Sequence, residues 1–331
     1  MLKSPFPWFG GKSRVAPLVW ERFGDVGNYI EPFFGSGAML LGRPETHEGG
    51  TETINDLDGY VANFWRAVQR APEVVARWAD QPVNENDLHA RHAWLVGRKA
   101  ALVTRLEGDP GFFDAQIAGW WVWGICSWIG GGWCSGKGPW YVEGGKLVRG
   151  TSGQGVSRQL PHLGKSGQGV NRQLPHLSFG RGVHRSNVGL FGWFDALAAR
   201  LRRVRVCCGG WERVCGPSVL GVRYPAGIFL DPPYADTATR CPDIYAEDSL
   251  TVAHAVRAWA IEHGEDPKIR IALCGYDGEH VMPASWDCVA WKARGGYGSR
   301  NKSNTDNKRE RIWFSPGCLP APQKLSRGTL F

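Results

Sequence analysis

Residues 28–37 read NYIEPFFGSG, and this stretch decides the fold class. Its first four residues predict a short strand, and the proline and glycines that follow predict a tight turn. The elements expected around it are helices at 15–23, 38–41 and 59–70 and a second strand at 51–55. The second strand runs directly into Asp56. A strand, a glycine turn, a helix, a strand and an acidic residue in this order predict a nucleotide-binding βαβ unit.

The same alternation of strands and helices returns in the last third of the chain. The expected elements are helices at 190–202 and 250–263 and strands at 204–208, 227–230, 269–274 and 310–315. Residues 73–118 also favour helices. We therefore expect an α/β fold in which a mostly parallel sheet carries helices on both faces.

Composition excludes several classes of protein. The chain has 331 residues, of which 43% are hydrophobic and 21% charged, so it can bury a core without disulfides and is neither disordered nor collagen-like. Its nine cysteines include no Cys-x-x-Cys pair. The absence of such a pair favours reduced thiols over a zinc site, and we expect no metal. No signal peptide or membrane helix is indicated, which predicts a soluble, cytoplasmic protein.

Positive charge is concentrated in the middle of the chain. Thirteen basic and three acidic residues lie between Lys137 and Arg213, so this stretch carries the excess that gives the chain its net charge of +8. Within it, residues 152–163 recur as 166–177 with a single difference, and a degraded third copy begins at 180. The repeat spaces Arg158, Arg172 and Arg185 along one segment, which suits binding to a polyanion such as DNA. A solvated loop without a partner is the alternative.

Two phosphate-binding motifs fail on inspection. Residues 11–13 (GKS) resemble the end of a P-loop, but its first glycine would fall on Phe6. Residues 35–37 (GSG) begin a dinucleotide fingerprint, but its third glycine would fall on Leu40. These failures argue against a kinase and a dehydrogenase.

The sequence Asp231-Pro232-Pro233-Tyr234 directly follows the apolar strand at 227–230. Prolines stiffen a turn and cannot donate a backbone hydrogen bond. The motif suits the binding of an exocyclic amino group on a flat ring. Asp231 and the Pro232 carbonyl would accept the two hydrogens, and Tyr234 would stack on the ring. A proline turn with a capping aspartate is the structural alternative.

Taken together, the motifs resemble those of the Dam-like (D12 class, alpha-group) DNA adenine-N6 methyltransferases. The matching stretches are 7–13 (PWFGGKS), 31–37 (EPFFGSG), Asp56, 206–211 (VCCGGW), 231–234 (DPPY) and 309–314 (RERIWF). They cover residues 5–70 and about 203–315, in the order found in that family. One position departs from the pattern, because the family usually carries an acidic residue where this chain has Gly210.

The resemblance implies a Rossmann-like S-adenosylmethionine-dependent methyltransferase sheet, interrupted by an irregular Gly/Trp-rich insert. The catalytic core would comprise 1–72 and 198–315, the DNA-recognition insert 73–197 with its repeat at 152–177, and a flexible tail 316–331. The implied cofactor-binding residues are Trp8, Gly11, Lys12, Glu31, Phe33, Gly35, Gly37, Asp56, Gly209 and Trp211. The implied catalytic residues are Asp231, Pro232, Pro233 and Tyr234.

The implied activity is methyl transfer from S-adenosylmethionine to the N6 amino group of a flipped adenine in double-stranded DNA, as in restriction–modification. The host would be a bacterial or phage-infected cell. Cytosine-N4 methylation, RNA methylation and a catalytically inactive DNA-binding protein on the same fold are the alternatives. Residues 323–331 loosely resemble the short peptides that dock on replication clamps, but their spacing differs and a disordered end is the favoured interpretation.

Overall fold

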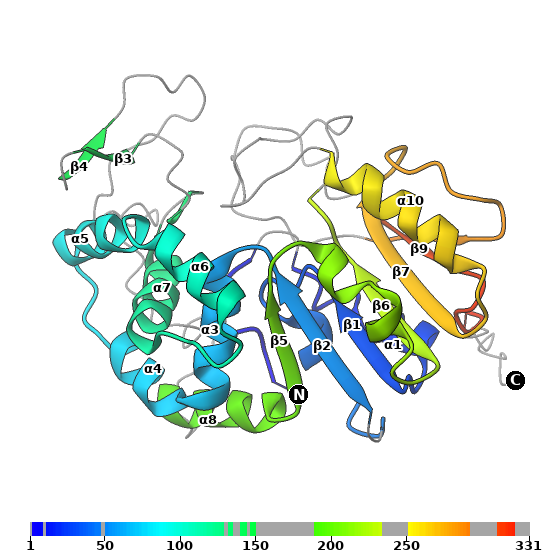
Figure 1. Cartoon of the computed structure of the whole chain (residues 1–331), viewed down its shortest axis with the longest axis horizontal. Helices are drawn as coiled ribbons and strands as arrows, with labels where there is room; N and C mark the ends of the chain where they lie inside the picture. Colours follow the sequence, from blue (N-terminus) through cyan, green and yellow to red (C-terminus); the bar gives the residue numbers. More distant parts are fainter. Residues whose placement is uncertain are drawn as a thin grey trace, which may run out of the picture.

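The computed structural model describes residues 2–8, 11–47, 50–128, 132–134, 189–233, 251–291 and 310–321, and the backbone of 140–143 and 146–149. Its centre is a seven-stranded mixed sheet in the order β5-β2-β1-β6-β7-β9-β8 (Figure 1). The strands are β1 (Asn28–Glu31), β2 (Thr51–Asp56), β5 (Val204–Cys208), β6 (Ala226–Leu230), β7 (Ile269–Tyr276), β8 (Asp287–Ala290) and β9 (Glu310–Phe314). A separate hairpin joins β3 (Trp140–Glu143) to β4 (Lys146–Arg149).

Five neighbouring strands, from β5 to β7, run parallel, and β9 lies antiparallel between β7 and β8. The carboxyl ends of the parallel strands therefore meet at one edge of the sheet. Strand β1 lies between β2 and β6. The strand order reverses there, because β2 and β5 follow on one side of β1 and β6 and β7 on the other. Open α/β sheets bind ligands in the crevice at such a switch point.

Alternation along the central strands builds a hydrophobic core on each face. In β6, Ile228 and Leu230 join one core while Phe229 joins the other. In β7, Ile271 and Leu273 divide in the same way from Ala272 and Cys274. Successive side chains of a strand point to opposite faces, so a strand that is apolar throughout must be covered on both. The expected α/β class with helices on both faces is confirmed.

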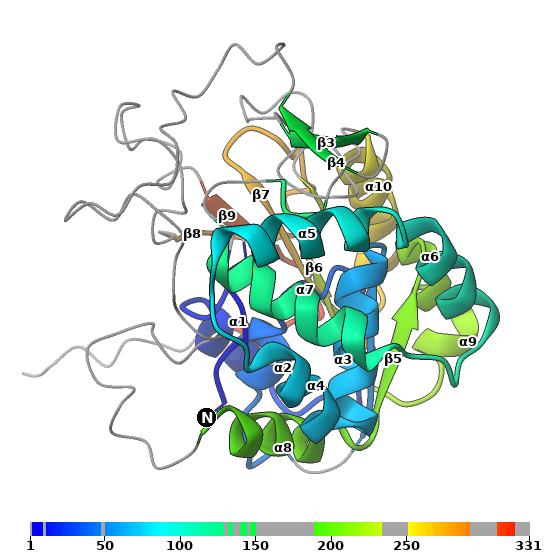
Figure 2. The same ribbon diagram turned by 90° about the vertical axis from the view of Figure 1, so that its left-hand side faces the viewer.

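The helices flank this sheet. They are α1 (Ala16–Phe23), α2 (Ala38–Leu41), α3 (Gly59–Arg70), α4 (Pro72–Ala79), α5 (Glu85–Val96), α6 (Lys99–Gly108), α7 (Ala115–Ser127), α8 (Leu190–Leu201), the 3₁₀ helix η2 (Trp211–Val214), α9 (Pro217–Leu220) and α10 (Val252–Gly264). Figure 2 shows α3, α4, α7 and α8 packed together beside the sheet. Among the described residues, no helix is long and apolar enough to span a membrane.

The tryptophan-rich segment within the expected insert forms helix α7. Trp121 and Trp123 are fully buried there, and the ring of Trp121 lies 4.9 Å from that of Phe6, edge to face. Both tryptophans are therefore core residues. Helices α4, α7 and α8 pack into the same hydrophobic core as α3. Helix α8 also crosses the expected boundary between insert and catalytic core at 197/198. The assignment of separate functions to the catalytic core and the insert therefore stays a prediction.

The structure adds several elements to the expected ones, namely the hairpin β3–β4, the short helices η2 and α9, and strand β8. Strand β8 at the sheet edge was not predicted, because its residues are mostly exposed and lack an apolar pattern. The first residues of the expected tail are held against α1, since the Leu319 N–H donates to the Arg22 carbonyl at 2.8 Å. The repeat and residues 322–331 lie outside the described residues.

Candidate functional site

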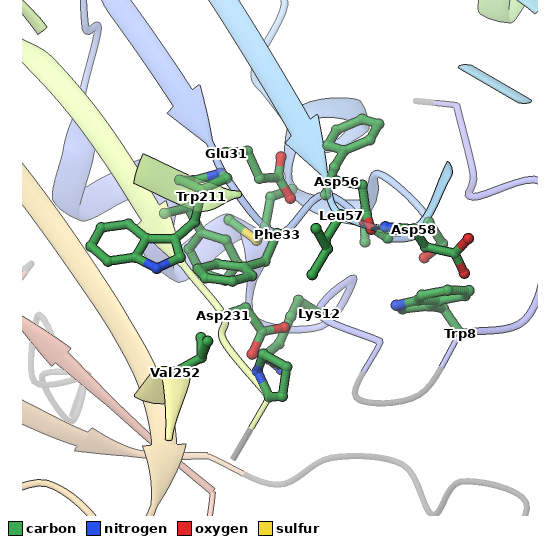
Figure 3. A pocket seen from close by; sticks show the side chains of 18 of the residues that line it. Trp8, Lys12, Glu31, Phe33, Asp56, Leu57, Asp58, Trp211, Asp231 and Val252 are labelled. Carbon is green, nitrogen blue, oxygen red and sulfur yellow. Dashed lines mark hydrogen bonds and ion pairs between the residues drawn. The ribbon is translucent and has the colours of Figure 1, made fainter. Parts of the chain in front are cut away.

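A cavity of about 200 Å³ opens at the carboxyl edge of the sheet, where the loops after β1, β2, β5 and β6 meet (Figure 3). Nine of the ten predicted cofactor residues line it, together with Asp231 and Pro233. They are Trp8, Gly11, Lys12, Glu31, Phe33, Gly35, Asp56, Gly209 and Trp211. Segments as far apart in the chain as Trp8 and Pro233 therefore line one cavity.

The glycine turn after β1 is shaped by its neighbours. Gly35 has a positive φ of 50°, and a Cβ there would lie 2.4 Å from the Trp8 indole nitrogen. Trp8 therefore packs directly on the turn, which only glycine allows. The Trp65 indole N–H donates to the Gly35 carbonyl at 2.9 Å and fixes the turn from the opposite element, α3.

Asp56 ties the ends of β1 and β2 together. Its carboxylate accepts hydrogen bonds from the backbone N–H groups of Gly35 at 2.8 Å and Asp58 at 2.9 Å. Burial and the charge of Asp58 raise the pKa of Asp56 to about 7, against the opposing effect of these two donors. Asp56, the acidic residue expected at the end of the second strand, thus both shapes the cavity and lines it.

Asp231 forms an ion pair across the cavity mouth. The Lys12 ammonium lies 2.8 Å from its Oδ1, and the lysine side chain is only 5% exposed. Burial raises the pKa of Asp231 and the ammonium opposes that shift. Burial would lower the pKa of Lys12, but the charges of Asp231 and Glu310 outweigh it and raise that pKa. Lys12, predicted to bind cofactor, thus also reaches the expected catalytic carboxylate.

Carboxyl groups dominate the ionisable lining of the cavity. Among the described residues of the lining they are Glu31, Asp56, Asp58, Glu212 and Asp231, against the single cation Lys12. Glu31 is buried, and burial raises its pKa well above the ordinary value, while the Tyr29 hydroxyl donates to its Oε2 at 2.8 Å. Once ionised, these carboxyl groups disfavour phosphates and suit a cationic ligand, although the whole chain is basic.

The loop after β5 forms the wall opposite Asp56. The Asn55 side chain donates to the carbonyls of Pro32 at 3.1 Å and Gly209 at 2.9 Å, so it joins this loop to the loop after β1. Trp211 is buried and lies edge to face against Trp259, with ring centroids 6.0 Å apart. Its indole plane is fixed by packing and presents a flat apolar surface to the cavity (Figure 3).

Two predicted residues differ from expectation. Gly37 does not line the cavity. Its φ of 72° instead shapes the turn, and a Cβ there would meet the Phe34 ring at 2.8 Å. Pro232 is buried and is also absent from the lining, whereas Pro233 belongs to it. Tyr234, Arg158, Arg172 and Arg185 lie outside the described residues.

Sequence reasoning missed several lining residues, including Leu57, Asp58, Glu212 and Val252. Leu57 and Asp58 directly follow Asp56, so their position after a strand end was a usable signal. Leu57 is 50% exposed, which is unusual for leucine and marks an apolar surface of the cavity. Val252 begins α10 and lacked any motif that could have revealed it.

Fold and site together define an α/β protein with a carboxylate-rich cavity at the switch point of its sheet. Residues 8–91 match the model of the D12 class N6 adenine-specific DNA methyltransferase family, so this part of the chain carries a D12-class domain. The family implies S-adenosylmethionine as the methyl donor and DNA as the substrate. A search of curated proteins finds no significant match. Asp231 and the loop after β5 lie outside the matched segment.

Proposed function

We propose that this protein transfers a methyl group from S-adenosylmethionine to the N6 amino group of adenine in DNA. The observation that carries the proposal is the position of Asp231. Its carboxylate lines the same cavity as the residues expected to bind the cofactor, although Asp231 lies far along the chain from the matched segment 8–91.

The cavity fits the methyl donor by its chemistry. S-adenosylmethionine is a cation with a flat base, a ribose diol and an amino-acid end, and when bound it would supply an electrophilic methyl group. Trp211, Phe33 and Leu57 offer apolar surface for the base, and Asp56 offers a carboxylate for the diol. The excess of carboxyl groups over Lys12 suits the positive charge.

Asp231 would act on the amino group of the target base. The lone pair of that nitrogen is delocalised into the ring, so the nitrogen is a weak nucleophile. A hydrogen bond to the Asp231 carboxylate favours a pyramidal nitrogen and stabilises the positive charge that develops on it. The Lys12 ammonium favours the ionised form of this partly buried carboxylate, and the amino group of the base would donate a hydrogen bond to the same carboxylate.

The target adenine lies inside a duplex and must be flipped out, which costs roughly a few kcal/mol of lost stacking and pairing. The basic stretch between Lys137 and Arg213 would hold the phosphates during that step. This assignment of the insert rests on its sequence.

The test is mass spectrometry of nucleosides from plasmid DNA, taken from cells without an adenine methylase that express the wild type or Asp231→Ala. We expect N6-methyladenine with the wild type and a loss of roughly a hundredfold or more with the variant. DNA binding should persist in the variant, and its loss in step with activity would refute the role of Asp231. Methylcytosine in place of methyladenine would overturn the assigned base.

A further inference from the structure

Position 210 lines the cavity without a side chain, although its backbone would accept one. Gly210 has φ −55° and ψ 149°, which any residue adopts, so the chain conformation does not require glycine here. A Cβ on Gly210 would lie 2.7 Å from Oε2 of Glu212. The carboxylate of Glu212 therefore takes the space in which a side chain at 210 would begin.

Glu212 itself lines the cavity from the 3₁₀ helix η2. Among the described residues, its side chain forms no hydrogen bond or ion pair, while its backbone carbonyl accepts the Cys215 N–H at 3.1 Å. The adjacent Arg213 is engaged elsewhere, since its guanidinium donates to the Cys208 carbonyl at 3.1 Å. The Glu212 carboxylate is thus available to a ligand in the cavity.

The backbone that carries Glu212 is anchored. The Gly209 N–H donates to the Asp56 carbonyl at 3.2 Å, and the Gly209 carbonyl accepts from Asn55 at 2.9 Å. Trp211, which separates these anchors from Glu212, is held by its contact with Trp259. Glu212 is exposed, and its carboxylate extends from this anchored backbone next to Trp211. A carboxylate there suits a heteroaromatic ring that carries a hydrogen-bond donor on its edge.

We propose that Glu212 reads the exocyclic amino group of the cofactor's adenine, in place of a side chain at position 210. The inference rests on the proposed function, because it assumes that the cavity binds this cofactor. An ionised carboxylate accepts hydrogen bonds and cannot donate them. It therefore favours an amino group over a carbonyl oxygen at the same ring position.

Binding measurements without turnover test this directly. The two probes are S-adenosylhomocysteine and S-inosylhomocysteine, which carry an amino group and a carbonyl oxygen, respectively, at carbon 6 of the purine. We expect the wild type to bind the adenosyl compound roughly tenfold more tightly or better in calorimetry, as a hydrogen bond to a charged group provides. In Glu212→Ala, affinity for the adenosyl compound should fall by that factor and affinity for the inosyl compound should not fall.

A second variant moves the carboxylate back to the position that glycine leaves open. The double variant Gly210→Asp with Glu212→Ala should recover the preference for the adenosyl compound, because the backbone at 210 accepts a side chain and the space is then free. Glu107→Gln is the matched control. Its carboxylate lies 3.7 Å from a Cβ built on Gly209 but is not part of the cavity lining, so the preference should be unchanged.

Three results would overturn the inference. The first is equal affinity of the wild type for both compounds. The second is an equal loss of affinity for both in Glu212→Ala, and the third is a preference that Glu212→Ala retains in full. Failure of the wild type to bind either compound would refute the proposed function as well, which distinguishes the two failures.

Discussion

At the scale of single residues, the charge on Asp231 depends on one neighbour. Burial favours the neutral carboxyl group, and the Lys12 ammonium at 2.8 Å favours the carboxylate. Only the carboxylate is a pure acceptor for an amino group. The ion pair is therefore as important to the proposed chemistry as Asp231 itself.

Replacement of Lys12 by methionine should move the acidic limb of the pH–rate profile to higher pH. Without the ammonium, the desolvated Asp231 keeps its proton to a higher pH, and activity then requires a more alkaline solution. The measurement is the pH dependence of kcat for the wild type and Lys12→Met. Lys3→Met, at an exposed position, should leave the profile in place. An unshifted limb in Lys12→Met would contradict this role.

Asp56 should couple cofactor binding to proton release. Its pKa of about 7 in the free protein lies above the ordinary value, so it holds a proton that a bound cation expels. Affinity for S-adenosylmethionine should therefore rise with pH and level off above about 7. Calorimetry at pH 6.5 in two buffers of different ionisation enthalpy should show protons released.

Two comparisons isolate the contribution of Asp56. Asp56→Asn has no proton to lose and should release fewer. S-adenosylhomocysteine lacks the sulfonium charge and should also release fewer than S-adenosylmethionine. Equal release in all of these cases would assign the protons to another group.

At the scale of elements, the close approach of α4 and α7 depends on glycine. A Cβ on Gly119 would lie 2.3 Å from the Cβ of Trp78 and 2.8 Å from the backbone carbonyl of Val75. Backbone cannot move as a side chain does, so a methyl group here must push the helices apart.

We expect Gly119→Ala to lower the free energy of unfolding by about 1–3 kcal/mol, as overpacking of a core does. Urea denaturation measures the change. Gly108→Ala is the matched control, because no atom lies within 4 Å of a Cβ at the end of α6 and alanine favours the helix. It should leave stability unchanged or raise it slightly. Similar effects of the two variants would mean that α4 and α7 tolerate separation.

At the scale of the whole molecule, the excess of basic residues and the carboxyl groups of the cavity belong to different segments of the chain. The chain carries a net charge of +8, yet carboxyl groups predominate in the lining of its cavity. The basic stretch between Lys137 and Arg213 suits a polyanion, while an acidic cavity suits a cation. The two proposed ligands, DNA and S-adenosylmethionine, have these charges.

The double variant Arg158→Ala with Arg172→Ala should weaken DNA binding and make it less dependent on salt. Each phosphate contact contributes roughly 0.9 to the slope of log affinity against log salt, so two lost contacts should reduce the slope by roughly 2. Filter binding between 50 and 200 mM salt is a suitable measurement. An unchanged slope would identify the repeat as a solvated loop.

Much of the fold and site could be predicted from sequence because the signals are local. Tyr29 and Ile30 favour a strand at 28–31, residues 32–37 contain those of a tight turn, and Asp231 follows an apolar run. Strand ends in a parallel sheet meet at one edge, so the motifs after β1, β2, β5 and β6 had to converge. The positions of Asp56, Trp211 and Asp231 follow from that rule alone.

Contacts between distant segments were decided by the tertiary structure. Neither the pairing of Lys12 with Asp231 nor the approach of α4 to α7 at Gly119 has a local pattern, since each depends on how two elements pack. The position of Glu212 at the cavity likewise has no local pattern, because the sequence around it shows only a carboxylate near two glycines. The fold places that carboxylate at the cavity next to Trp211, because the anchored loop after β5 and the helix η2 fix the backbone from which the Glu212 side chain extends.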